Sequence, residues 1–192
     1  MKMDYMLQDI QAKLEKRLKP KRFIHSVNTM RTSVELAERY GADTDEAALA
    51  GLLHDCARDL SKTKLLTLCD KYGIVPDEVL KRQPGLLHGK IGACIARDDF
   101  GIASPQILEA ISSHTMGSPG MSLLASIIFL ADYIEPARTF PGVDAIREEA
   151  FKDLKRAMLI GIDGTISTII DKGVLLHPDT VMTRNWLISS ET

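Results

Sequence analysis

The fold class is decided by residues 3–41, MDYMLQDIQAKLEKRLKPKRFIHSVNTMRTSVELAERYG. Apolar residues recur in this stretch every three or four positions, which is the spacing of one face of an α-helix. Pro20 separates two such runs, and Gly41 follows the second. No convincing run of strict apolar and polar alternation, the pattern of a half-buried strand, occurs elsewhere in the sequence. The sequence therefore predicts an all-α protein.

The same spacing and the usual helix end signals predict further helices along the rest of the chain. Ser61 is expected to cap a helix that ends before Gly73. The other predicted helices cover residues 45–56, 88–100, 104–114, 122–135, 144–172 and 179–187. The helix over 144–172 is expected to be interrupted or bent near Gly161 and Gly164. No repeat or composition shift marks a boundary, so residues 1–192 are expected to form one helical-bundle domain.

The composition excludes several classes of protein. The chain has 192 residues, of which 45% are hydrophobic and 26% are charged, values that suit one globular core and argue against disorder. The 24 Lys and Arg residues against 26 Asp and Glu residues give a net charge of −2. Nucleic acid or an anionic membrane is therefore not expected as the main partner.

The cysteines and the apolar stretches indicate the compartment. Cys56, Cys69 and Cys94 are odd in number and lack a metal-type spacing, which favours small core residues in a reducing compartment, most simply the cytoplasm. The N-terminus has no apolar region typical of a secretory signal. The longest uncharged stretch, residues 110–131, is broken by GSPG at 117–120 and is not expected to span a bilayer.

Four of the five histidines, His25, His54, His88 and His114, fall at ends or on apolar faces of the predicted helices. Asp55 follows His54 directly, and Asp132 follows the uncharged helical run of residues 123–131. Because an ionised carboxylate without a partner is costly to bury, Asp132 must be protonated, paired with a base or bound to a cation. One such histidine alone is more often a hydrogen-bonded core residue, but the series as a whole favours a divalent metal site on converging helices.

Three other features bear on anion binding. Arg58 and Arg138 follow the two acidic positions closely, and the planar guanidinium suits phosphate, although a surface ion pair explains Arg58 equally well. The segment from His177 to Thr180 is interpreted first as a helix start capped by Asp179 or Thr180. The basic residues Lys16, Arg17, Lys19, Lys21 and Arg22 are interpreted as a solvated helix end and given no role.

The stretch GLLHDCAR at residues 51–58 resembles the signature of HD-domain metal-dependent phosphohydrolases, whose core pattern is His, His-Asp, Asp. Further segments resemble the bacterial HD-type symmetrical bis(5'-nucleosyl)-tetraphosphatases, and the resemblance runs from about residue 21 to 187. These segments are LHGKIGA at 87–93, SHTMG at 113–117, LADYIEPAR at 130–138, FPGV at 140–143 and HPDTV at 177–181. Met116 and Ser126 depart from the threonine and lysine more usual in that family.

The resemblance implies a role for each matching residue. It implies that His25, His54, Asp55 and Asp132 ligate iron or a similar metal, with one or two ions and with Mn, Co, Ni or Zn left open. It implies catalytic roles for Asp55, His88 and His114. The implied contacts to a dinucleoside polyphosphate or ADP-like nucleotide come from Arg58, His88, His114, Thr115, Arg138, His177 and Thr180. A homodimer is left open.

The activity implied by the resemblance is symmetrical hydrolysis of diadenosine tetraphosphate to two ADP by a metal-bound hydroxide. Asp55 would orient the water, and His88, His114 and Arg138 would stabilise the transferred phosphoryl group or protonate the leaving ADP. Two alternatives remain: an HD-type nucleotidase that acts on mononucleotides, and a nucleotide-sensing module with a structural metal. The histidines beyond the core pattern argue against the second alternative.

Overall fold

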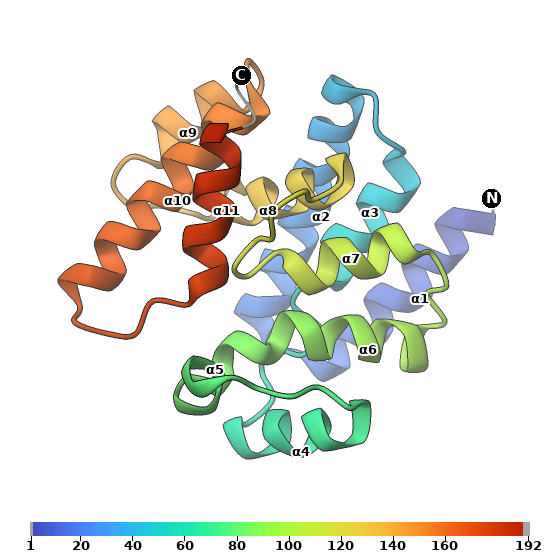
Figure 1. Cartoon of the computed structure of the whole chain (residues 1–192). Coiled ribbons are helices and arrows are strands. Elements are labelled where there is room, and N and C mark those ends of the chain that lie inside the picture. Colours follow the sequence, from blue (N-terminus) through green and yellow to red (C-terminus); the bar gives the residue numbers. More distant parts are fainter. Residues whose placement is uncertain (1, 190–192) are drawn as a thin grey trace.

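The computed structural model describes residues 2–189, and no strand occurs in this range, in agreement with the predicted all-α class. The chain forms α-helices α1 to α11 and one short 3-10 helix, η1, between α5 and α6 (Figure 1). Their bounds are α1 (Lys2–Arg17), α2 (Pro20–Tyr40), α3 (Thr44–Leu53), α4 (Lys62–Tyr72), α5 (Glu78–Arg82), η1 (Pro84–Leu87), α6 (His88–Phe100), α7 (Pro105–Ser113), α8 (Leu123–Ile134), α9 (Val143–Ala150), α10 (Leu154–Asp171) and α11 (Pro178–Ser189).

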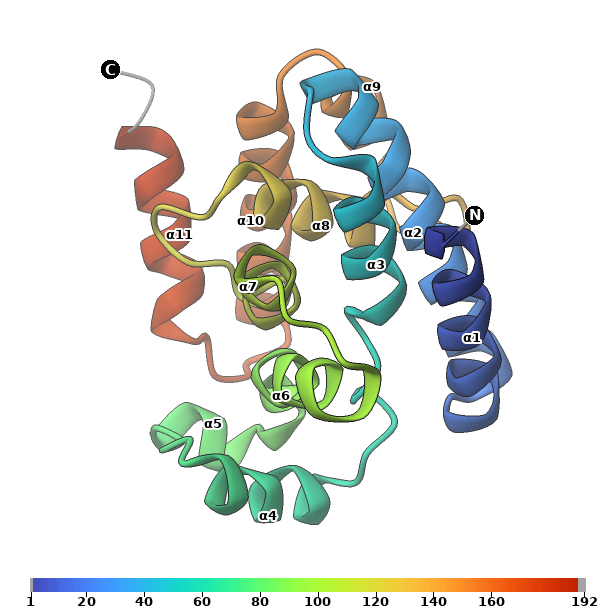
Figure 2. The same ribbon diagram turned by 90° about the vertical axis from the view of Figure 1, so that its right-hand side faces the viewer.

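Helix α8 lies at the centre of the bundle. It packs against α2, α3, α7 and α10, and its residues from Leu124 to Ala131 are all buried. A helix that is apolar on every side is stable only when other elements surround it. In both views α2 and α3 lie on one side of α8 while α10 and α11 lie on the other (Figures 1 and 2). The bundle therefore holds the carboxyl end of α8, which carries Asp132, between two groups of helices.

Helix α3 ends at Leu53, earlier than the predicted end at residue 56. Asp43 caps its start by accepting a hydrogen bond from the Glu46 backbone N–H at 2.9 Å. His54 and Asp55 consequently lie in the turn that follows the helix. Helical geometry does not constrain their side chains there, so both can point into the bundle.

The predicted position of the break in residues 144–172 is wrong. The chain leaves the helix at residues 151–153, and α10 then runs without interruption through Gly161 and Gly164. Asp153 starts α10 because its carboxylate accepts the Arg156 backbone N–H at 3.0 Å. Gly161 serves packing instead: a Cβ on this residue would come within 3.3 Å of the Tyr133 ring.

The predicted cap of the last helix is also wrong. The imidazole of His177 caps α11, because its Nδ1 accepts the Asp179 backbone N–H at 3.1 Å, and neither Asp179 nor Thr180 is needed for that role. The uncharged stretch 110–131 is divided between α7 and α8. Within residues 2–189 we find no helix with the length and apolar character needed to cross a membrane. Cys56 and Cys69 are buried as predicted, whereas Cys94 is half-buried.

Candidate active site

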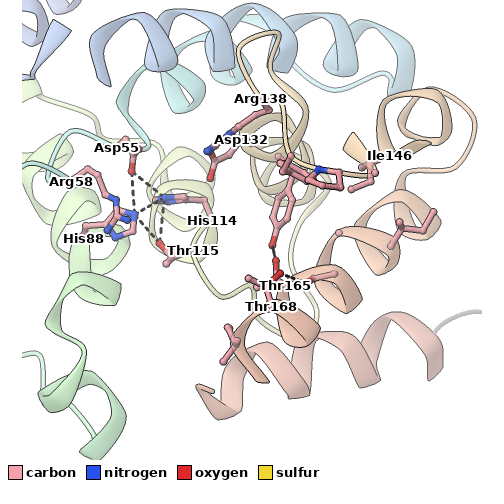
Figure 3. Close-up of a pocket in the computed structure, with 18 of the residues that line it drawn as sticks. Asp55, Arg58, His88, His114, Thr115, Asp132, Arg138, Ile146, Thr165 and Thr168 are labelled. Atoms are coloured by element: carbon pink, nitrogen blue, oxygen red, sulfur yellow. Dashed lines mark hydrogen bonds and ion pairs between the residues drawn. The ribbon is translucent and has the colours of Figure 1, made fainter. Parts of the chain in front are cut away.

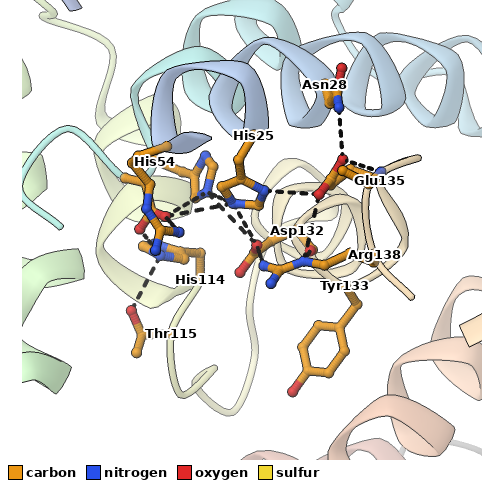
Figure 4. A network of polar contacts seen from close by, with 12 residues as sticks. His25, Asn28, His54, His114, Thr115, Asp132, Tyr133, Glu135 and Arg138 are labelled. Atoms are coloured by element: carbon orange, nitrogen blue, oxygen red, sulfur yellow. Dashed lines mark hydrogen bonds and ion pairs between the residues drawn. The ribbon is translucent and has the colours of Figure 1, made fainter. Parts of the chain in front are cut away.

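Five elements bring four histidines and two aspartates to one point. His25 comes from α2, His54 and Asp55 from the turn after α3, His88 from the first position of α6, His114 from the position after α7, and Asp132 from α8. The four imidazoles are 0–7% exposed. Figure 4 shows His25, His54 and His114 directed toward the carboxylate of Asp132. The structure thus brings together the residues that the sequence singled out, which we call the His/Asp cluster.

The orientation of each imidazole is fixed by its Nδ1 atom. Nδ1 of His54, His88 and His114 lies 2.7, 2.6 and 2.7 Å from the carbonyl oxygens of Gly51, Gly85 and Ile111, each three residues earlier. A carbonyl oxygen only accepts, so each Nδ1 carries the hydrogen and donates. For His54 and His114 the accepting carbonyls belong to the last turns of α3 and α7, which lack partners within the helix. These hydrogen bonds therefore keep the hydrogen on Nδ1 and leave the Nε2 lone pair directed into the cluster.

The Nε2 atoms meet in two pairs. Nε2 of His25 lies 3.1 Å from Nε2 of His54, and Nε2 of His88 lies 3.0 Å from Nε2 of His114. With the hydrogen on Nδ1, a neutral imidazole directs a lone pair at its partner, which is repulsive unless a cation or a proton lies nearby. The Thr115 hydroxyl is 3.2 Å from the His88 Nε2, so it can donate to one of these lone pairs. Nε2 lone pairs that converge in this way are typical of histidines that bind a metal ion.

The carboxylate of Asp55 lies between the two pairs. Its Oδ2 is 3.6 and 3.5 Å from the Nε2 atoms of His25 and His54, and its Oδ1 is 3.1 and 3.6 Å from those of His88 and His114. Asp132 adds Oδ1 at 3.0 Å from the His25 Nε2. Potential ligand atoms of the cluster form three overlapping groups, each close enough together to hold a cation. These groups are His25, His54 and Asp55; His54, His114 and Asp132; and Asp55, His88 and His114.

The electrostatics of the cluster fit a cation. Burial lowers the pKa of His54, but the adjacent Asp55 and Asp132 outweigh this effect and raise it, because they favour positive charge at this point. Burial likewise opposes ionisation of Asp55, yet the histidines around it hold its pKa well below the usual range. Burial lowers the pKa of His88, which keeps that imidazole neutral and available as a ligand. Burial also opposes ionisation of Asp132, but His25, His54 and Arg138 lower its pKa. Both aspartates are thus ionised and His88 is neutral near pH 7.

Glu135 is a buried residue of the site to which the sequence assigned no role. It is 2% exposed, and its Oε1 accepts from the His25 Nδ1 at 3.1 Å. Its Oε2 accepts from the Asn28 side chain at 3.0 Å and from the Ala137 backbone N–H at 2.8 Å. Burial opposes ionisation, but these donors lower the pKa of Glu135, so it is an anion. His25 is therefore oriented by a carboxylate, whereas the other three imidazoles are oriented by carbonyls.

A cavity of about 680 Å³ opens beside the cluster and is lined by Asp55, His88, His114, Thr115 and Asp132 (Figure 3). Its size is within the range of small-molecule sites, about 300–1,000 Å³. Three arginines line it: Arg22, Arg58 and Arg138. The cavity therefore combines a candidate metal centre with groups that bind phosphate.

Arg22 corrects the interpretation of the basic segment as a solvated helix end. Its Nη1 donates to Asp55 Oδ2 at 2.6 Å, so this guanidinium belongs to the site. Arg138 donates through Nη2 to Asp132 Oδ1 and through Nε to the Asp132 carbonyl oxygen at 2.7 Å. The Arg58 Nη1 donates to the Gly85 carbonyl oxygen at 3.3 Å.

His177 and Thr180 lie elsewhere and are not among the residues that line the cavity. His177 is buried, with Nε2 2.8 Å from Asp77 Oδ2 at the start of α5, so it links the start of α11 to α5. Thr180 donates its backbone N–H to the His177 carbonyl oxygen at 3.1 Å. The structure does not bring these two residues to the cluster, and their substrate contacts stay predictions.

The fold and the cluster define the class of protein. The HD domain model matches residues 22–137, and the chain belongs to that family. It is 40% identical over 178 residues to the symmetrical bis(5'-nucleosyl)-tetraphosphatase of Bacillus subtilis, covering 93% of this chain and 95% of that protein. It is 41% identical over 167 residues to the protein of the same name from Halalkalibacterium halodurans, covering 87% of this chain and 89% of that protein.

A solved structure extends the likeness to three dimensions. The crystal structure of a predicted HD superfamily hydrolase involved in NAD metabolism from Clostridium acetobutylicum superposes with a TM-score of 0.93 at 44% sequence identity. The match covers 95% of this chain and 97% of that one. The whole described helical arrangement, and not the His/Asp cluster alone, is therefore shared with an HD hydrolase.

Proposed function

We propose that this chain is a metal-dependent hydrolase that cleaves diadenosine tetraphosphate and related dinucleoside tetraphosphates symmetrically into two nucleoside diphosphates. The single observation that carries the proposal is the cavity in which three arginines adjoin the His/Asp cluster. The similarity to symmetrical bis(5'-nucleosyl)-tetraphosphatases over nearly the full length of both chains supports the substrate.

The reaction adds water across one phosphoanhydride bond. Water oxygen bonds to the second phosphorus from one nucleoside, the bridge to the third phosphorus breaks, and the bridging oxygen leaves with the other nucleoside diphosphate. His25, His54, Asp55 and Asp132 would hold a cation, and His88 and His114 would be available to hold a second one with Asp55. When bound, the metal would supply Lewis acidity and activate a water molecule. Asp55, already ionised, is also placed to accept a hydrogen bond from the attacking water and so to orient it.

The arginines and Thr115 act on the phosphates. Arg22, Arg58 and Arg138 enter the cavity, and a guanidinium donates two parallel hydrogen bonds to a phosphate group. The Thr115 hydroxyl, between His88 and His114, is placed to donate to a phosphoryl oxygen. Donors already in position stabilise charge that develops as the bridging bond breaks. These contacts hold the chain of phosphates against the cluster during attack.

We propose iron as the metal. Four imidazoles and two carboxylates form a mixed nitrogen and oxygen donor set, which suits first-row transition metals better than Mg²⁺ or Ca²⁺. Elemental analysis of protein purified without added metal tests this assignment, with Mn, Co, Ni and Zn as the competing results. One or two equivalents of iron agree with the proposal, and a different dominant metal contradicts it.

The activity is tested with metal-loaded protein and diadenosine tetraphosphate. We expect cleavage by the wild type, loss on chelation, recovery on metal addition, and no cleavage by Asp132→Asn. Asp144→Asn is a matched control because Asp144 is exposed in α9 and is not among the cavity residues. Phosphate release from mononucleotides without action on the dinucleotide would favour the nucleotidase alternative. Metal and nucleotide binding without any turnover would favour the sensing module.

Two further features belong to the proposal. Residues 1–192 act as one domain, which predicts a single cooperative thermal transition. The protein is cytoplasmic, which cell fractionation tests. Several thermal transitions would contradict the single domain, and recovery outside the cytoplasm would contradict the location.

A further inference from the structure

The cavity continues beyond the phosphate-binding groups into an apolar lobe, formed by Tyr133, Phe140, Ile146, Ile160 and Ile169. Figure 3 shows Ile146, with Thr165 and Thr168, at the opposite end of the cavity from Arg58, His88 and His114. Except for Tyr133, the lobe residues follow the segment that the HD domain model matches, which ends at residue 137. The hydrolytic chemistry described above uses none of these side chains.

We propose that the apolar lobe binds the base and sugar of one nucleoside of the substrate. This inference rests on the proposed function, because it assigns the part of the substrate that the cluster and the arginines leave unbound. The lobe is continuous with the cluster in one cavity, so a ligand with its phosphates at the cluster extends into it. Phe140 and Ile160 are each 39% exposed, and they offer an aromatic face and an aliphatic face to a flat base.

Gly164 makes the lobe open on the α10 side. Glycine destabilises the interior of a helix relative to alanine, so its presence there calls for a reason. The backbone gives none, because Gly164 is not among the positive-φ glycines. Packing gives none either, because a Cβ at Gly164 would meet nothing within 4 Å. Gly164 lines the cavity, and the space that a side chain would occupy there is available to a ligand.

Two hydroxyl groups supply polar contacts in the lobe. The Tyr133 hydroxyl and Thr165 Oγ1 lie 2.6 Å apart, and one donates to the other. The pair therefore has a second O–H hydrogen that can be donated to a ligand. An edge of the base or a sugar hydroxyl is a suitable acceptor.

The position of the lobe also explains a symmetrical cut. With one nucleoside held in the lobe, the number of phosphates that fit between the lobe and the cluster determines which phosphorus meets the activated water. The other half of the substrate then extends toward Arg58, at the opposite end of the cavity in Figure 3. The lobe is thus a determinant of both affinity and cleavage position.

Two lobe variants and two matched controls test the inference. Gly164→Leu fills the lobe, and Ser167→Leu places the same side chain at an exposed α10 position that does not line the cavity. Phe140→Ala removes the aromatic face, and Phe151→Ala removes a ring that is 38% exposed outside the cavity. Calorimetry measures the affinity of each metal-loaded protein for ADP and for inorganic pyrophosphate. Thermal unfolding confirms that each variant is folded.

We expect ADP to bind about fivefold or more weakly to Gly164→Leu and to Phe140→Ala, since base stacking contributes at least this much. Pyrophosphate affinity and both controls should stay at the wild-type level. Unchanged ADP affinity in the lobe variants, or equal losses for ADP and pyrophosphate, would overturn the inference. Symmetrical cleavage by the wild type together with unchanged ADP affinity in the lobe variants would refute nucleoside binding in the lobe but not the proposed function. Weakened ADP binding in the lobe variants without cleavage by the wild type would refute the proposed function alone.

Discussion

Glu135 provides a sharp test of how the cluster is held in place, through the substitution Glu135→Gln. The two carboxylate oxygens accept from three donors, on His25, Asn28 and Ala137. A glutamine has only one acceptor oxygen. The largest number of hydrogen bonds is kept when that oxygen replaces Oε2 and serves the Asn28 and Ala137 donors. The glutamine NH₂ then faces Nδ1 of His25.

The consequence for the metal follows from the histidine tautomer. To accept from the NH₂ group, His25 must move its hydrogen from Nδ1 to Nε2, which places N–H where the cluster needs a lone pair. Loss of such a ligand-orienting partner typically lowers metal affinity about 10- to 100-fold, or about 1.4–2.7 kcal/mol. Glu135→Ala leaves all three donors without an acceptor, at about 1–3 kcal/mol each if they stay dry, and should also lower the unfolding temperature.

The assay is calorimetric titration of metal-free protein with Co²⁺ at pH 7. Wild type and Glu148→Gln, whose carboxylate is 74% exposed, should bind alike, and Glu135→Gln should lose affinity at the position that includes His25. The binding at His88 and His114 should change less, because their orientation depends on carbonyl groups. Wild-type affinity in a folded Glu135→Gln protein would refute the argument from tautomers.

Three further predictions concern catalysis and stability. His114→Ala should lower turnover strongly while at least one metal stays bound at His25 and its neighbours; unchanged turnover with full metal content would contradict this role. Arg138→Lys should lose part of kcat/KM and Arg138→Ala more, about 1.5–3 kcal/mol of transition-state stabilisation, and equal rates for all three proteins would exclude a phosphate contact. The pKa of Asp77 is lowered by the Leu80 backbone N–H and by His177, so its contribution to stability is present above the unfolded pKa and is lost as the pH falls through the folded pKa. Asp77→Asn should therefore have a lower unfolding temperature than wild type near pH 7, with the difference shrinking below about pH 4, and a difference independent of pH would disprove it.

The parts of the site that the sequence predicted are those carried by local patterns. His54 and Asp55 stand together after an apolar helix, and Asp132 is conspicuous in an apolar stretch, so each is visible without knowledge of the fold. Glu135 and Arg22 were missed because their roles exist only in the folded chain. Glu135 contacts a histidine 110 positions away, and Arg22 contacts Asp55 across 33 positions. A carboxylate directly after an apolar helix was the available signal for Glu135.

The errors in the fold have local physical causes. Glycines inside residues 144–172 suggested a bend, but Gly161 only makes room for the Tyr133 ring. The true boundary is set by the Asp153 side chain, which caps the start of α10. The helical spacing of apolar residues continues across this boundary and therefore does not reveal it. Likewise a histidine, which is not a usual cap, starts α11 because its other nitrogen bonds to Asp77, a contact between distant segments. Boundaries of this kind depend on tertiary structure and are not visible in a single sequence.

The most direct test of the proposed function is the position of bond cleavage in ¹⁸O-labelled water. Metal-loaded protein is incubated with diadenosine tetraphosphate, and the products are separated by anion-exchange chromatography and weighed by mass spectrometry. We predict ADP as the sole nucleotide product, two per substrate, with one ¹⁸O atom in the terminal phosphoryl group of one of the two. ATP with AMP, or labelled inorganic phosphate, would contradict it.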